Sequence, residues 1–166
     1  MLPTYIKMFK ELIKLKSQED KKILFVGIGN LLKTDDGVGV YISKRIQNRA
    51  KISSLTVEVG IENYIGKINS MDPDILVLID CTDMRSSSGT FKLLSINQIH
   101  DLTFNTHSIS LKRLSEFFRM PVYILGIQPE RIDFGENLSY LVRNVADRII
   151  NQINRLEVHH GCRICL

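Results

Sequence analysis

The sequence predicts a three-layer α/β/α sandwich around a mostly parallel, roughly five-stranded sheet. Three continuous apolar runs, at 23–26, 75–79 and 122–127, are typical of central strands that are covered on both faces. Segments with apolar residues at helical spacing lie between them, so strands alternate with helices along the chain. That alternation is typical of a parallel sheet with helices on its two faces.

Length and composition fit a single core domain. The chain has 166 residues, of which 44% are hydrophobic and 24% charged, as in ordinary globular proteins. The formal charge of +4 comes without a dense arginine run or a basic stripe with interleaved aromatics, so we expect no nucleic-acid partner. No apolar run approaches the ~20 residues of a membrane span. Three cysteines make no disulfide framework, so we expect a cytoplasmic protein.

The chain divides into three parts. Residues 1–21 are expected to form an N-terminal helix, at 4–17, and a polar linker. Residues 22–157 form the α/β domain. Residues 158–166 are a tail that contains histidine and cysteine.

The first unit of the domain is a strand, a glycine turn and a helix. Gly27 and Gly29 follow the first apolar run and let the backbone turn tightly. Residues 34–36, Thr-Asp-Asp, offer side-chain oxygens to the free N–H groups of a helix start. Apolar residues at spacing four between Val38 and Ile46 then form one helix face.

The remaining elements follow from the same periodicities. Strands are expected at 52–60, 74–80, 90–96 and 121–127, helices at 61–71, 108–119 and 138–156, and a loop at 97–106. Ligands of such folds bind outside the carboxyl ends of the strands. Polar residues at those ends are therefore the candidates for chemistry.

Three such residues make a plausible metal triad. Asp36 follows the first strand, Asp80 ends a central strand, and His107 precedes a helix. Two carboxylates and one imidazole suit a borderline divalent ion such as nickel or zinc. A helix start favours an ionised Asp36 and a neutral His107, which is the form that binds a metal. Three protein ligands leave positions open for a substrate group.

Each of these residues also has a purely structural interpretation. Asp35 or Asp36 can cap a helix, Asp80 can hydrogen-bond to a neighbouring turn, and His107 can be structural. Other kinds of site fit less well. The glycine turn lacks the third glycine of a dinucleotide fingerprint. A phospho-accepting receiver domain needs a lysine after the last strand, and this chain has none there. A serine nucleophile is not indicated, because no serine lies in a Gly-x-Ser-x-Gly elbow.

Four motifs occur in a characteristic order: Gly27-Ile-Gly29-Asn30 with Asp35-Asp36-Gly37-Val-Gly39, then Leu78-Ile-Asp80-Cys-Thr-Asp83-Met84, Thr106-His107-Ser108, and Leu125-Gly126-Ile127-Gln128-Pro129. Together they resemble the hydrogenase maturation endopeptidases, an aspartyl-type peptidase family that trims the C-terminus of the large subunit of nickel-iron hydrogenases. The second and fourth motifs look most like the branch that serves membrane-bound or archaeal-type hydrogenases.

The resemblance implies a substrate, a metal and a site. The substrate is the precursor of a nickel-iron hydrogenase large subunit, and the nickel is already placed in that precursor. Asp36, Asp80 and His107 would complete its coordination, so that an empty precursor is not cut. For the chemistry we expect a water activated by the carboxylates of Asp36 and Asp80, with the metal as Lewis acid. We expect no organic cofactor, and a monomer.

The same resemblance names candidate substrate-binding residues. These are Gly29 and Asn30 in the glycine motif, and Glu62 and Asn63 in the loop after the second strand. That loop lacks an aspartate that the family often carries, and Glu58 is the nearest substitute.

Two other functions remain open. One is a zinc-dependent hydrolase that keeps its own metal. The other is a non-catalytic nickel-delivery or adaptor protein, for which the tail, His159-His160-Gly-Cys162-x-x-Cys165, supplies imidazole and thiolate groups.

Overall fold

The computed structural model describes residues 14, 21–58, 60–98, 103–104 and 111–155. Of the helix predicted at 4–17, only Lys14 falls in these ranges, and it is helical. The tail at 158–166 lies outside them. So do residues 105–110, which include His107.

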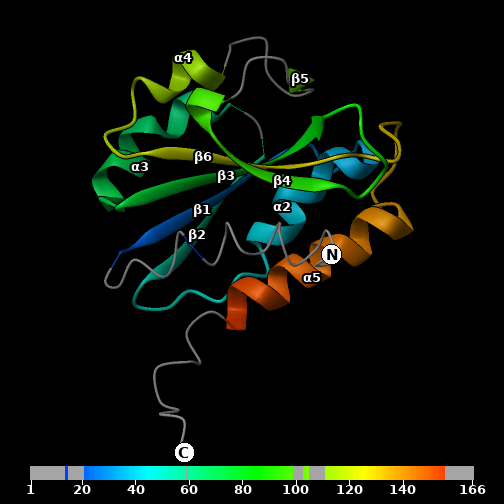
Figure 1. The fold of residues 1–166 in the computed structure, drawn as a ribbon, viewed down its shortest axis with the longest axis horizontal. Helices are drawn as coiled ribbons and strands as arrows, with labels where there is room; N and C mark the ends of the chain where they lie inside the picture. The colour runs from blue at the N-terminus through cyan, green and yellow to red at the C-terminus, as the bar shows by residue number, and fades with distance from the viewer. Residues whose placement is uncertain (1–13, 15–20, 59, 99–102, 105–110, 156–166) are drawn as a thin grey trace, which may run out of the picture.

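Five strands form the main sheet, in the order β2-β1-β3-β6-β4 (Figure 1). The first four of these are parallel neighbours, and β4 pairs antiparallel with β6 at the edge. Their bounds are β1 Ile23–Ile28, β2 Ile52–Val57, β3 Ile75–Asp83, β4 Phe91–Ser95 and β6 Val122–Ile127. The predicted mostly parallel, five-stranded sheet is confirmed, with its three most apolar strands in the middle.

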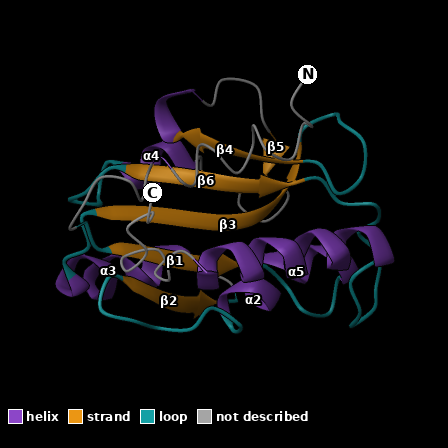
Figure 2. Ribbon diagram, turned by 60° about the horizontal axis from the view of Figure 1, so that its bottom comes forward, coloured by secondary structure: helices purple, strands orange, loops and turns teal. Residues whose placement is uncertain are grey.

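Helices cover both faces of the sheet (Figure 2). On one face lie α2 (Val38–Ser43) and α5 (Tyr140–Arg155), and on the other α3 (Ile65–Met71) and α4 (Leu111–Ser115). Successive residues of β1 divide between the two cores, because side chains of a strand alternate in direction. Ile23 and Phe25 pack with α2 and α5, whereas Leu24 and Val26 pack with the α3 side. The predicted three-layer sandwich is confirmed.

Two of the helices begin with a tighter turn. The 3-10 helix η1 (Thr34–Gly37) precedes α2, and η2 (Ile61–Tyr64) precedes α3. A third such turn, η3 (Ile96–Gln98), follows β4. The predicted apolar face of α3 is correct at Ile68, which is fully buried, but wrong at Met71, which is 39% exposed at the end of the helix.

The end of β3 differs from the prediction. The sequence suggested that the strand ends at Asp80, but it continues to Asp83. The added residues pair antiparallel with β5 (Thr103–Phe104), which lies within the segment predicted to be a loop. Pairing between distant segments leaves no local pattern in the sequence. The length of the apolar run therefore underestimated the length of the strand.

Two glycines let α2 lie directly on the sheet. A Cβ at Gly27 would stand 2.1 Å from the Gly39 carbonyl oxygen, and a Cβ at Gly39 would stand 2.2 Å from that of Ile79. The sequence suggested that Gly27 is a turn residue, and this prediction is wrong. It lies inside β1 and gives α2 room to approach the backbones of β1 and β3.

Candidate active site

The candidate site lies at the carboxyl edge of the parallel strands. Ile79 pairs with Gly27 of β1, and Asp80 pairs with Gly126 of β6, so Asp80 lies beside the last residues of β1 and β6. Asp36 lies in η1, which contacts β3. Both aspartates are buried, at 3% exposure for Asp36 and 0% for Asp80. The structure thus brings two of the three predicted metal ligands to one edge of the sheet.

Asp36 is positioned by the glycine motif that precedes it. The backbone N–H of Asn30 donates a hydrogen bond to Asp36 Oδ2 at 3.2 Å. A Cβ at Gly29 would stand 1.9 Å from the Asp36 carbonyl oxygen, and Gly29 has a φ of +146° that favours glycine. The side chain of Asn30 shapes the same loop by accepting a hydrogen bond from the N–H of Leu32 at 2.9 Å. Gly29 and Asn30 therefore have a structural role here, and their predicted contact with substrate stays a prediction.

Asp80 points toward the face of the sheet that α3 and α4 cover. Its neighbours Ile79 and Cys81 both belong to the core under α2 and α5, so Asp80 must point the other way. One carboxylate oxygen accepts the N–H of Cys81 at 2.8 Å. A buried carboxylate is costly unless a charge or hydrogen bonds compensate for lost hydration, which makes Asp80 suited to bind a cation.

Asp35 has a different and purely structural role. Its carboxylate is fully buried and accepts the backbone N–H groups of Glu130, Arg131 and Ser139 at 2.9, 3.1 and 2.7 Å. The Ser139 hydroxyl donates to it at 2.9 Å. Neither η1 nor α2 has a side-chain cap. Asp35 therefore joins the loop after β6, and the residue before α5, to η1.

Thr34 strengthens the same junction. Its hydroxyl donates to the Arg131 carbonyl at 2.9 Å, and its N–H donates to the Gly135 carbonyl at 2.7 Å. With Asp35 this makes a dense set of hydrogen bonds between η1 and residues 130–139. The position of Asp36 is set from both sides, by Asn30 before it and by this junction.

Gln128 holds the loop after β3, a role that was not predicted from the sequence. Its side-chain oxygen accepts the N–H groups of Met84 and Ser86 at 2.7 and 3.3 Å, and so holds the loop after β3. The N–H of Arg85 and the Gln128 amide both donate to Asp83 Oδ1, and these bonds lower the pKa of Asp83. The feature of the sequence that marks this residue is the Gly-Ile-Gln-Pro motif at 126–129.

Glu62 and Asn63 lie in η2 and are both exposed. Among the described hydrogen bonds and ion pairs, none joins either residue to Asp36 or Asp80. Glu58, the expected substitute for the family aspartate, is exposed and lies 3.5 Å from the ammonium group of Lys44. The N–H of Gly29 donates to the Glu58 carbonyl at 3.1 Å, so this loop does adjoin the glycine motif.

The third predicted ligand, His107, lies outside the described residues, as do Cys162 and Cys165. Within the described ranges, no three His, Cys, Asp or Glu side chains lie together in a way that could hold a metal ion. In the same part of the chain, no helix has the length and apolar character that crossing a membrane requires.

Comparison with known proteins identifies a consistent group of relatives. The family model for HycI, described as hydrogenase maturation protease, matches residues 40–156. A Methanocaldococcus jannaschii protein assigned to the hydrogenase maturation proteases is 32% identical over 161 residues, covering 87% of this chain and 93% of its own length. The hydrogenase 3 maturation protease of Escherichia coli K12 is 24% identical over 140 residues, with 81% and 90% covered.

Solved structures share the fold. The [NiFe] hydrogenase maturation protease HycI of Thermococcus kodakarensis aligns with a TM-score of 0.75 at 24% identity, covering 86% of this chain and 97% of the other. The E. coli hydrogenase maturating endopeptidase HybD aligns with a TM-score of 0.65 at 20% identity, covering 80% and 89%.

Proposed function

The chain belongs to the hydrogenase maturation protease family, and from this premise we propose that it removes a C-terminal peptide from the precursor of a nickel-iron hydrogenase large subunit after nickel insertion. The observation that carries the proposal is the placement of Asp36 and Asp80, two buried carboxylates at one edge of the sheet. The carboxylate of Asp35 accepts hydrogen bonds from the junction with residues 130–139, so we assign the chemistry to Asp36, the other acidic residue of that pair. The proposal includes a monomer that acts in the cytoplasm.

In this proposal the nickel ion belongs to the substrate. Asp36, Asp80 and His107 complete its coordination when the precursor docks. A cation beside Asp36 and Asp80 compensates for the lost hydration of their buried carboxylates, so a loaded precursor binds more tightly than an empty one. Discrimination between the two follows from charge alone, without any contact that reads the peptide sequence.

The cut itself requires an activated nucleophile. Cys81 is the cysteine nearest the site among the described residues, but it is fully buried in the core under α2 and α5. We therefore assign the attack on the scissile carbonyl to a water molecule that gives its proton to a carboxylate of Asp36 or Asp80. As the C–N bond breaks, that carboxyl group passes the proton to the nitrogen of the departing C-terminal peptide. The substrate's metal ion would act as the Lewis acid.

The test is the intact mass of the large subunit from cells with and without this protein. We expect the subunit to keep its C-terminal extension only when the protein is missing. Trimming in both strains would contradict the proposal. Adding the Asp80→Asn variant back should leave the extension in place, whereas the exposed, charge-matched control Asp72→Asn should restore trimming.

Metal analysis separates this proposal from a zinc hydrolase with its own ion. We expect the purified protein to carry far less than one equivalent of zinc or nickel, because the substrate supplies the metal. Stoichiometric zinc that survives dialysis would favour the zinc hydrolase. An adaptor protein would bind the precursor without shortening it, which the intact mass would reveal.

A further inference from the structure

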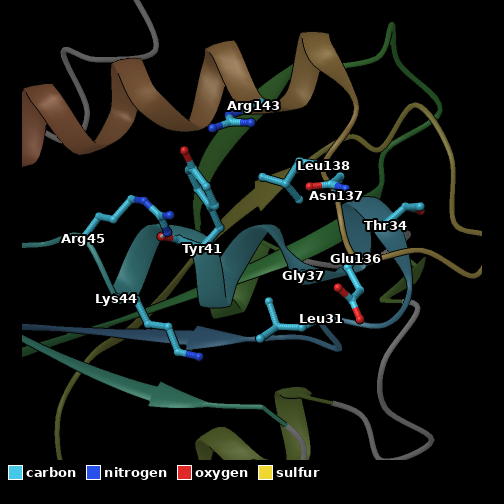
Figure 3. Close-up of a pocket in the computed structure, with 10 residues that line it drawn as sticks. All are labelled: Leu31, Thr34, Gly37, Tyr41, Lys44, Arg45, Glu136, Asn137, Leu138 and Arg143. Atoms are coloured by element: carbon cyan, nitrogen blue, oxygen red, sulfur yellow. Dashed lines mark hydrogen bonds between the residues drawn. The ribbon is translucent and has the colours of Figure 1, made fainter.

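A cleft of about 330 Å³ opens on the side of α2 and α5 (Figure 3), and neither Asp36 nor Asp80 is among its lining residues. Its walls come from η1, from α2 and the residues just after it, and from the start of α5 with the loop before it. Leu31 and Leu138 line it with apolar surface, and the charged groups Lys44, Arg45, Arg143 and Glu136 surround it. None of these residues has a part in the proposed reaction.

Tyr41 organises the centre of this cleft. Its hydroxyl donates a hydrogen bond to Asp147 Oδ1 of α5 at 2.8 Å, which fixes the ring. The Arg45 guanidinium lies 3.7 Å from the ring centroid, and that of Arg143 lies 5.9 Å from it. Figure 3 shows the two arginines reaching Tyr41 from different elements. Stacking on an aromatic face restrains a guanidinium and leaves its N–H edges available.

The balance of charge in the cleft favours an anion. Lys44 is already paired with Glu58 at 3.5 Å, and Asp147 accepts from Tyr41. Arg45 uses one nitrogen, Nη1, to donate to the Tyr41 carbonyl at 3.0 Å. Arg143 makes no side-chain hydrogen bond or ion pair with the described residues. Two guanidinium groups therefore remain to receive a ligand, against the one lining carboxylate of Glu136.

We propose that this cleft binds an acidic segment of the substrate protein, with aspartate or glutamate side chains on Arg45 and Arg143. A guanidinium binds a carboxylate through two parallel N–H···O bonds, and the apolar walls suit an aliphatic residue between two acidic ones. Naming the substrate as the partner rests on the proposed function. The cleft's preference for carboxylates rests only on its own residues.

The cleft is placed to act together with the reaction site. Thr34 and Gly37, the two ends of η1, line the cleft, and Asp36 lies between them in the same short helix. The hydrogen bonds of Thr34 and Asp35 join η1 to residues 130–139, which include the lining residues Glu136 and Leu138, so the cleft and Asp36 belong to one hydrogen-bonded unit. A segment bound in the cleft would thus anchor the precursor at a set distance from the cutting site.

The first test needs no hydrogenase. The peptide acetyl-Glu-Leu-Glu-amide is titrated into the whole protein, and the side-chain Nε–H signals of the protein's arginines are followed by NMR. We expect the signals of Arg45 and Arg143 to shift, and the neutral acetyl-Gln-Leu-Gln-amide to leave them in place. Equal shifts with both peptides, or none with either, would overturn the proposed carboxylate site.

The second test uses the precursor. In the double variant Arg45→Gln with Arg143→Gln, we expect KM for precursor cleavage to rise about tenfold with kcat unchanged, because the lost contacts are remote from the reacting bond. The matched control is Lys92→Gln, an exposed cation on β4 whose neighbours Phe91 and Leu93 face the α2 and α5 core. It should leave both constants unchanged.

An unchanged KM in the double variant would overturn the substrate role of the cleft. If the wild-type protein cleaves no precursor at all, the proposed function fails. The peptide titration still decides whether the cleft binds carboxylates.

Discussion

The carboxylate of Asp35 accepts two hydrogen bonds from Ser139, one from its N–H at 2.7 Å and one from its hydroxyl at 2.9 Å. Ser139 immediately precedes α5, the longest described helix. The negative charge of Asp35 therefore lies at the positive end of the α5 dipole, which stabilises both. Through this contact the start of α5 and the short helix that holds Asp36 form one unit.

Replacing Asp35 with asparagine should destabilise the protein by about 3 kcal/mol. The buried N–H groups lose a charged acceptor, and at least one of them would face the NH2 group of the asparagine, which is itself a donor. Urea unfolding measures the change. The matched control is Asp72→Asn after α3, which is exposed and should cost less than about 1 kcal/mol. Equal stability of the Asp35 variant and the wild type would show that the junction does not hold the fold.

Asp36→Asn and Asp80→Asn should each abolish cleavage while the unfolding free energy stays within about 1 kcal/mol of wild type. Both carboxylates are buried, so loss of their charge removes a desolvation cost as well as hydrogen-bond strength. Mass spectrometry of the precursor and thermal unfolding provide the two readouts. A cut precursor with either variant would remove that residue from the mechanism.

Gly39→Ala should destabilise the protein by about 3 kcal/mol or more, since the new methyl group would stand 2.2 Å from the Ile79 carbonyl oxygen and 2.3 Å from that of Ile28. Both contacts are backbone atoms that cannot move without shifting β1 and β3. Gly66→Ala in α3 is the control, because nothing lies within 4 Å of its Cβ position. That variant should gain up to about 1 kcal/mol from helix propensity. Similar effects for the two would contradict close packing of α2 on the sheet.

The pKa of Asp83 is lowered by the Arg85 backbone N–H and then by the Gln128 side chain. A group with a lowered folded pKa stabilises the protein above its unfolded pKa, near pH 4, and loses that contribution as pH falls through the folded value. Gln128→Met should raise the pKa of Asp83 toward its ordinary value, as followed by carboxyl carbon NMR. An unchanged pKa at Asp83 would show that Gln128 contributes nothing to it.

Much of the architecture was predictable because it depends on neighbouring residues. The apolar run of β3 needs cover on both faces, and the spacing of Val142, Val145, Ile149 and Ile153 places them on one buried side of α5. The edge of the sheet that holds Asp36 and Asp80 followed from the same patterns, because parallel strands end together. The predicted roles of His107, Glu62 and Asn63 remain predictions.

The three layers, the alternation of strands and helices, and the edge of the sheet that carries two acidic residues follow from local patterns in the sequence, since each depends on periodicity within a few residues. The different surroundings of Asp35 and Asp36, which are adjacent and chemically identical, appear only in the folded structure. Asp35 meets Glu130, 95 positions away, and Ser139, 104 positions away. Asp36 is held by Asn30, six positions before it, at the edge where β3 carries Asp80. A side chain's role depends on the donors that surround it, and folding brings those donors from distant parts of the chain.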